Sequence, residues 1–498
     1  MSTEIPTGVL PSFRAAFSSP ARLRTEVLAG LVVALALIPE AISFSILAGV
    51  DPRVGLFASF TMAVTIAFTG GRPAMISAAT GAIALVVAPV VLEHGLDHLI
   101  ATVLLAGVLQ VLLSVFGVAR LMRFIPRSVM VGFVNALAIL IFSAQIPHLV
   151  GVPWLVYPLV AVGLLVLVFF PRLTTVIPAP LIAIVALTIV VVWVGWSVPN
   201  VHDQGELPGS LPTLLLPDVP LTLETLQIIA PYALAMALVG LMESLMTAKL
   251  VDDITETHSD KTREGWGQGV ANLVTGFFGG MGGCAMIGQT MINVRASGAR
   301  TRISTFCAGV FLLVLVVVLG DVVALIPMAA LVAIMVFVSW ATFDWHSIDP
   351  RTLRRMPKSE TAVMLVTVVA TVWTHNLAIG VVLGVVVAMI AFANRVAHLV
   401  RVDRELTEVD GVPTATYTVE GELFFASSND LYTMFDYAED PARVVIDLTR
   451  SHLWDASTIA ALDSITAKYE ERGTEVTVVG LNAASRRMRE TMSGMLNG

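Results

Sequence analysis

The chain has 498 residues, of which 56% are hydrophobic and only 13% are charged, with a mean hydropathy of +0.85 and a formal net charge of −8. A soluble protein of this size carries about 25% charged residues, so the composition excludes an ordinary soluble protein and predicts a polytopic membrane protein. The two cysteines, Cys284 and Cys307, cannot form a disulfide framework, and we interpret them as small packing residues.

The N-terminal segment, residues 1–26, is polar and contains proline and arginine. It lacks a short apolar core followed by a small-residue cleavage site, so it does not have the pattern of a cleaved signal peptide. We interpret it as a cytoplasmic segment that precedes the membrane part.

Residues 27–397 are almost continuously apolar and divide into fourteen predicted membrane segments. The segments begin near residues 27, 54, 75, 97, 124, 153, 178, 225, 264, 285, 303, 324, 359 and 376. If the N-terminus is cytoplasmic, nearly all arginines and lysines of this region fall in inside loops, and the outside loops hold only Arg53. The positive-inside rule therefore predicts that both termini are cytoplasmic.

Segments three and ten are unusual because they are short and follow a glycine-rich stretch. Such segments at matching places in two halves are typical of an inverted-repeat transporter, here over residues 27–196 and 225–397. A half-helix that begins inside the membrane has unpaired N–H groups and a partial positive charge at its start. Two such starts facing each other would bind an anion without a fixed cation. The residues available to line this site are Ala78, Ala79, Thr80, Gly81, Ile287, Gly288, Gln289 and Thr290.

Segments one and eight each carry an acidic residue in an apolar run, Glu40 and Glu243. An intramembrane acid costs roughly 2.5–3.5 kcal/mol on insertion scales and is a functional residue by default. Next to an anion site the two carboxylates would repel the anion unless they carry protons, which predicts proton coupling. The alternative is a Na⁺ ion held by Glu243 and the hydroxyl of Thr247, which lies one turn later on the same helix face.

The composition changes near residue 400, where the chain becomes polar. We predict a linker over residues 398–413 and a small α/β domain over residues 414–498. In this domain, residues 415–427 read as a pair of strands, and a helix, a strand, a helix, a strand and a helix follow.

The chain resembles the sulfate permease (SulP) family of anion transporters in three stretches, LALIPEAISFSILAGVDPRVGLFASF, GGRPAMISAATGAIA and LVGLMESLMTAKLVDDITETHSDKTREGWGQGVANLVTGFFGGMGGCAMIGQTMINV. The C-terminal stretch VVIDLTRSHLWDASTIAALDSI resembles a STAS domain, the cytoplasmic module of these transporters. The resemblance implies a polytopic all-α domain of fourteen segments in a 7+7 inverted repeat, plus a small α/β STAS domain. It implies a core domain of segments 1–4 and 8–11 that moves against a gate domain of segments 5–7 and 12–14, and a homodimer.

The family's substrate site lies between segments three and ten and is also lined by segments one and eight. The positions of this chain that match it for substrate binding are Phe44, Thr80, Gly81, Gly288, Gln289 and Thr290. The positions that match it for proton or cation coupling are Glu40, Glu243 and Thr247.

Two positions depart from the family pattern. Animal members commonly have an arginine where this chain has Gln289, and the loss of that cation favours cation-coupled symport over chloride exchange. In the STAS domain, Ser457 matches the phosphorylated position of bacterial anti-sigma antagonists, whereas its neighbours differ from theirs.

These observations predict a secondary active anion transporter of the bacterial inner membrane that works by alternating access and proton symport. Two acids and a pocket of small residues without arginine favour a small carboxylate or a dicarboxylate such as fumarate. The alternatives are a Na⁺-coupled bicarbonate or sulfate transporter, a nucleobase symporter, and a membrane-anchored signalling protein with a STAS output. No P-loop, zinc motif or nucleophile triad occurs, so we expect no enzyme activity, no cofactor, no metal and no nucleic-acid partner.

Overall fold

The computed structural model describes residues 7–117, 125–173, 178–409 and 411–493. The first residues of the predicted N-terminal segment, the predicted start of segment five near residue 124, and the last residues of the predicted α/β domain lie outside this description. Contacts between residues divide the chain into two compact units, Met1–Val385 and Val386–Gly498.

The first unit is helical, and its elements match the predicted membrane segments. Within the described residues, six helices are long and apolar enough to cross a membrane, and four shorter helices are also apolar. The helices of the segments are α2 (Pro20–Ala48), α3 (Pro52–Thr69), α4 (Gly81–Val115), α6 (Arg127–Ser143), α7 (Val156–Phe169), α8 (Ala179–Val194), α9 (Leu223–Thr255), α10 (Lys261–Phe277), α11 (Ile287–Met291) with a π-helical turn (Ile292–Ala296), α12 (Arg302–Val318), α14 (Met328–Thr342), α16 (Lys358–Thr374) and α17 (Leu377–Ala397). Shorter helices are α1 (Val9–Ala16), α13 (Gly320–Ala324) and α15 (Pro350–Arg355).

Helix α4 contains the third and the fourth predicted segments. At Gly95 its backbone leaves the helical conformation, with φ 80° and ψ −173°. Glycine adopts this conformation without a steric cost, because it has no Cβ atom. The break at Gly95 therefore separates two segments that are continuous in the chain.

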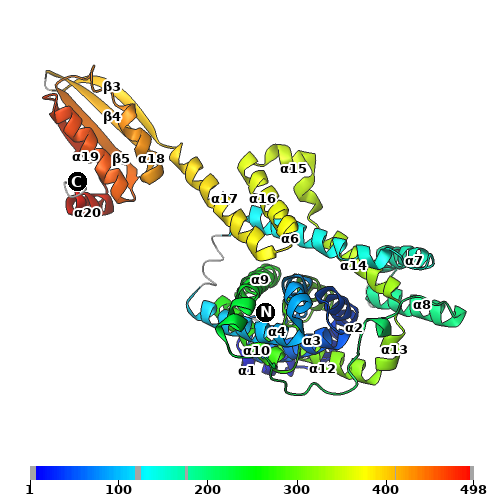
Figure 1. Cartoon of the computed structure of the whole chain (residues 1–498). Helices are drawn as coiled ribbons and strands as arrows, with labels where there is room; N and C mark the ends of the chain where they lie inside the picture. Colours follow the sequence, from blue (N-terminus) through cyan, green and yellow to red (C-terminus); the bar gives the residue numbers. More distant parts are fainter. Residues whose placement is uncertain (1–6, 118–124, 174–177, 410, 494–498) are drawn as a thin grey trace. The chain divides into compact units, whose positions relative to one another are not determined.

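The membrane helices pack into two groups (Figure 1). In the core domain, α10 packs on α3 and α4, α9 packs on α4, and α12 packs on α2 and α3. In the gate domain, α6 packs on α14 and α16, and α7 packs on α8 and α14. These two groups are the core and gate domains that the resemblance implies.

Two very short strands join segments three and ten inside the core domain. Strand β1 (Ser77–Ala78) pairs antiparallel with β2 (Cys284–Ala285), and Ala78 lies opposite Cys284. One residue further along, the N–H of Met286 donates to the carbonyl of Ile76 at 2.9 Å. The backbone that precedes both half-helices is thus hydrogen-bonded to itself, as a non-helical chain within a membrane requires.

Side chains from the neighbouring helices hold this crossing in place. The Asn272 amide donates to the carbonyl of Gly283 at 3.0 Å and accepts from its N–H at 2.8 Å. The hydroxyl of Ser244 accepts from the N–H of Ala285 at 3.1 Å. The position of β2 is therefore fixed from both α10 and α9.

The second unit contains the C-terminal α/β domain, with helices α18 (Phe425–Leu431), α19 (Ala456–Glu470) and α20 (Ala483–Met492). Its described sheet has the order β3–β4–β5–β6, formed by Arg401–Val409, Val412–Leu423, Arg443–Leu453 and Glu475–Val479. Strands β3 and β4 are antiparallel, whereas β5 and β6 add in parallel. The apolar residues of the sheet and of α19 form a core of their own.

Two features of this domain differ from the sequence prediction. Residues 401–409, in the predicted linker, form the edge strand β3. The strand pair predicted over residues 415–427 is wrong: β4 is one strand, followed by α18. The strand continues through Gly421, which stays paired with Ser451 of β5 after a register shift. Ser457 is exposed in the first turn of α19.

A buried carboxylate, Asp440, organises the hydrogen bonds at one end of this domain. It accepts from the hydroxyls of Tyr417, at 2.7 Å, and of Tyr469. Arg404 donates to it from Nε at 2.8 Å, and the Asp440 side chain is only 1% exposed. Burial, and then the bond to Asp440, raise the pKa of Tyr469 well above its usual range, so this hydroxyl stays a donor at neutral pH.

We expect Asp440→Asn to destabilise the C-terminal domain by about 3 kcal/mol, because two buried hydroxyls and an arginine lose a charged acceptor. Thermal unfolding of the purified full chain, followed by the fluorescence or circular dichroism of this domain, measures the change. Asp403→Asn on the exposed face of β3 is the control and should leave the unfolding temperature within error. Equal stability of the two variants would show that Asp440 does not hold this cluster.

We expect Gly283→Ala to destabilise the core domain by about 1–3 kcal/mol, because a Cβ atom at Gly283 would lie 2.1 Å from the carbonyl oxygen of Ala78. The measurement is the unfolding temperature of the protein in detergent. Gly209→Ala is the matched control, since nothing lies within 4 Å of a Cβ atom there. A Gly283→Ala protein as stable as the control would mean that the close contact between β1 and β2 can relax freely.

Candidate functional site

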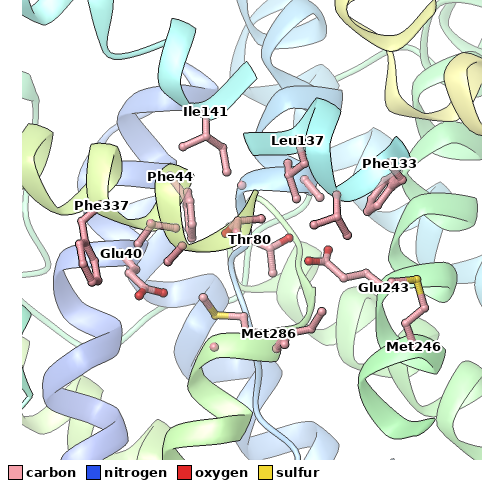
Figure 2. A pocket seen from close by; sticks show the side chains of 18 residues that line it. Glu40, Phe44, Thr80, Phe133, Leu137, Ile141, Glu243, Met246, Met286 and Phe337 are labelled. Atoms are coloured by element: carbon pink, nitrogen blue, oxygen red, sulfur yellow. The ribbon is translucent and has the colours of Figure 1, made fainter. Parts of the chain in front are cut away.

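A cavity of about 370 Å³ lies between the core and gate domains (Figure 2). The core domain contributes residues from α2, α4, α9 and the start of α11, and the gate domain contributes residues from α6 and α14. The lining consists of Glu40, Phe44, Thr80, Gly81, Ala82, Phe133, Val134, Leu137, Ile141, Glu243, Met246, Met286, Ile287, Gly288, Phe337, Val338, Ala341 and Thr342. Six predicted site residues are therefore brought together here: Glu40, Phe44, Thr80, Gly81, Glu243 and Gly288.

The two acids reach the cavity from opposite sides, with Thr80 between them (Figure 2). Glu40 follows Pro39 within α2, where the missing N–H of the proline interrupts the helical hydrogen bonds. Glu243 lies on α9 and is 8% exposed. In the part of the chain that the structure describes, no basic side chain lines the cavity, so these two carboxyls are its ionisable groups.

Thr80 is the N-cap residue of helix α4 and lies at the cavity wall. Its hydroxyl accepts from the N–H of Ile83 at 3.3 Å and so caps the helix. The next residue is Gly81, where a Cβ atom would lie 2.9 Å from the ring of Phe44. The absence of a side chain at Gly81 therefore lets Phe44 pack against the start of the helix.

Cys284 lies behind the cavity wall and contacts two of the site residues. Its thiol donates to Oε2 of Glu243 at 2.8 Å and is 3.1 Å from the hydroxyl of Thr80. The interpretation of Cys284 as a small packing residue is therefore incomplete. Cys284 lies next to α9 because β2 pairs with β1, and this pairing between distant segments is not visible in the sequence. Cys307 is half-buried, and both cysteines are free thiols.

Three predicted site residues do not line the cavity. Gln289 is buried, and its side chain lies near the Glu40 carboxyl and interacts with it. The hydroxyl of Thr290 accepts from the N–H of Ile76 at 3.0 Å and therefore holds the crossing strands. Thr247 donates to the carbonyl of Glu243 in its own helix at 2.8 Å and is fully buried. These side chains support the site from behind.

The sequence reasoning missed the wall that the gate domain provides. Phe133, Leu137 and Ile141 lie four residues apart on α6 and present one face, and Phe337 and Ala341 do the same on α14. This spacing is the ordinary pattern of a buried helix face, so nothing distinguishes a cavity wall from a packing surface. Met246 and Met286 complete the lining on the core side. Among the described residues, no group of three or more His, Cys, Asp or Glu side chains could hold a metal ion.

Comparison with known proteins identifies the two parts of the chain. The profile of the sulfate permease family matches residues 23–157 and 152–367, and the STAS domain profile matches residues 403–495. YbaR of Bacillus subtilis, which is named for sulfate transport, is 52% identical over 95% of this chain and 97% of its own length. The bicarbonate transporter BicA of Picosynechococcus is 27% identical over 76% of this chain and 71% of its own length.

Solved structures have the same architecture. The transmembrane domain of a cyanobacterial bicarbonate transporter BicA superimposes with a TM-score of 0.65 at 25% identity, over 72% of this chain and 98% of that one. The murine Slc26a9 anion transporter in the inward-facing state shares the fold with a TM-score of 0.82 at 18% identity, over 98% of this chain and 90% of that one. The fold is thus the predicted fourteen-segment membrane domain in a 7+7 inverted repeat, followed by a STAS domain. The chain belongs to the sulfate permease family of membrane anion transporters.

Proposed function

We propose that this anion transporter carries a small carboxylate or dicarboxylate in symport with protons. The observation that supports the proposal is the pair of carboxyl groups, Glu40 and Glu243, on one cavity whose described lining has no basic side chain. An anion entering this cavity with both acids ionised would meet two like charges in surroundings of low dielectric constant. Protonation of the acids removes this repulsion, because a neutral carboxyl carries no charge and has an O–H that can donate a hydrogen bond.

The apolar lining of the cavity supports the proposal that the substrate is an organic anion. Its walls are mainly apolar, with Phe44 on the core side and Phe133, Leu137 and Phe337 on the gate side. Such walls contact a carbon skeleton favourably, whereas a small inorganic oxyanion would leave them unfilled. The half-helix starts at Gly81 and Ile287 add backbone N–H groups for the anionic ends of the substrate.

The position of the cavity between core and gate supports alternating access. The core carries the acids and both half-helix starts, so a rigid movement of the core against the gate would carry the bound anion with it. We propose that the protein is a homodimer in the bacterial inner membrane. The excess of arginine and lysine in the inside loops supports cytoplasmic termini.

The second candidate is Na⁺-coupled transport of bicarbonate or sulfate. The names of the relatives BicA and YbaR favour bicarbonate or sulfate as the substrate. The Na⁺ ion would bind at Glu243. Thr247 gives this site little support, because its hydroxyl donates to a carbonyl of its own helix and does not reach the cavity.

The test of the proposal is uptake of radiolabelled anions into proteoliposomes. We expect concentrative uptake of fumarate or succinate when the outside is acidic and Na⁺ is absent. Uptake of bicarbonate or sulfate that requires Na⁺ at constant pH would favour the second candidate. Absence of uptake for every anion would favour the signalling role of the STAS domain.

We expect Glu243→Gln to keep anion binding but to abolish accumulation driven by a pH gradient, because the amide resembles the protonated acid and cannot release a proton. The measurement is uptake with an inward proton gradient in Na⁺-free buffer, compared with anion exchange at equal concentrations on both sides. Exchange should survive in the variant. Gradient-driven accumulation at the wild-type level would rule out Glu243 as the coupling group.

We expect Gly288→Trp to reduce transport at least tenfold without unfolding the protein. Gly288 lines the cavity and nothing lies within 4 Å of a Cβ atom there, so the indole can occupy the space of the anion. Uptake and unfolding temperature are measured together, with Gly209→Trp in an exposed loop as the control. Normal uptake by Gly288→Trp would place the anion elsewhere.

A further inference from the structure

Three buried side chains form a hydrogen-bonded row at the cavity wall: Thr80, Cys284 and Glu243. The hydroxyl of Thr80 and the thiol of Cys284 are 3.1 Å apart, and the thiol is 2.8 Å from Oε2 of Glu243. Thr80 and Glu243 line the cavity, whereas Cys284 is fully buried behind them. The thiol therefore connects two groups that an anion in the cavity would contact.

Hydrogen bonds hold the backbone on both sides of Cys284. Cys284 is paired with Ala78 across the two short strands. The preceding Gly283 is bonded to Asn272, and the following Ala285 donates to Ser244, which is the neighbour of Glu243 on α9. These bonds fix the backbone and therefore the Cβ atom of Cys284, and the contacts of the sulfur with Thr80 and Glu243 define where the thiol lies. The hydrogens of the row can then reorient while its heavy atoms stay in place.

When Glu243 is ionised, the available donors and acceptors define which group donates each hydrogen bond along the row. A carboxylate only accepts hydrogen bonds, so the single thiol hydrogen of Cys284 points to Glu243. The sulfur then acts as an acceptor toward Thr80. The Thr80 oxygen accepts from the N–H of Ile83, and its own hydrogen points to the sulfur. In this state the hydroxyl offers no hydrogen to the cavity.

A proton bound at Oε2 of Glu243 reverses this direction. The carboxylic acid donates to the sulfur, and the thiol hydrogen rotates toward the oxygen of Thr80. That oxygen accepts from both the thiol and the N–H of Ile83, so the Thr80 hydrogen is released toward the cavity. One proton enters at Glu243, every other group keeps its own hydrogen, and no bond between heavy atoms changes.

We propose that Cys284 is a positioning residue that transmits the protonation of Glu243 to the Thr80 hydroxyl and so supplies a hydrogen-bond donor for the anion. The inference rests on the proposed proton coupling. The titratable groups that face Glu243 are the thiol from β2 and, across the cavity, Glu40 from α2. The described lining from α4, α6, α11 and α14 contributes no charged side chain.

The first test compares the affinity for radiolabelled succinate at an acidic and an alkaline pH, by binding to the full chain in detergent. We expect a strong preference for acidic pH in the wild type and a preference about tenfold smaller in Cys284→Ala, because Thr80 is then released at both pH values. Cys284→Ser, which keeps a donor and an acceptor, should restore the preference. Cys307→Ala is the control and should match the wild type.

The outcomes separate the two proposals. A wild-type affinity that is independent of pH would refute proton coupling and the row together. A pH-dependent wild type with an equally pH-dependent Cys284→Ala would refute the row alone. Loss of affinity by the same factor at both pH values would assign Cys284 a packing role, which also refutes the row.

The second test measures the hydrogen bonding of the Cys284 thiol by infrared spectroscopy and does not require transport. In Cys307→Ala the Cys284 thiol is the only one in the chain, and the frequency of its infrared S–H stretch reports the acceptor of its hydrogen. We expect the band to shift on acidification, when the acceptor changes from a carboxylate to a hydroxyl. Glu243→Gln in the same background should remove the pH dependence. A band that does not move with pH in the parent protein would overturn the proposal.

Discussion

The structure depends on one constraint: a chain that interrupts its helices within a membrane must still pair the exposed backbone groups. Strands β1 and β2 meet this constraint by pairing with each other, and Asn272, Ser244 and Thr290 bond the backbone on either side. The pairing places the starts of two half-helices beside each other. The pairing that satisfies the backbone therefore also places Thr80, Gly81 and Gly288 at the cavity.

The two domains contribute different kinds of side chain to the cavity. The core domain carries the polar and acidic residues on elements that the crossing strands hold rigidly. The gate domain contributes mainly apolar side chains, which can slide past the core without losing hydrogen bonds. Both acids and Thr80 reach the cavity from the core, so the groups that can bind an anion all belong to one of the two domains.

The acidic residues inside the core domain separate into two kinds. Glu264 accepts from the N–H groups of Gly71 and Arg72, and Glu26 accepts from those of Arg300 and Thr301. These two carboxyls stabilise loops by satisfying the backbone. Glu243 instead accepts from a side chain, the thiol of Cys284, and Glu40 lies near the side chain of Gln289. Both acids face the cavity. Their carboxyls remain available to a substrate or a proton, which agrees with a role in coupling.

The sequence by itself determined the fourteen segments, the two halves and the C-terminal domain. Intramembrane acids and short glycine-rich segments are energetically costly and therefore stand out in a sequence, and they indicated Glu40, Thr80, Gly81, Glu243 and Gly288 on the cavity, whereas Phe44 came from the family resemblance. Only the tertiary structure decided the rest. Whether the side chains of Gln289, Thr290 and Thr247 point into the cavity or away from it depends on the neighbours that each one contacts. The role of Cys284 depends on a strand pairing between distant segments. The apolar gate wall and the edge strand β3 gave no local signal, since ordinary packing faces and polar linkers have the same pattern.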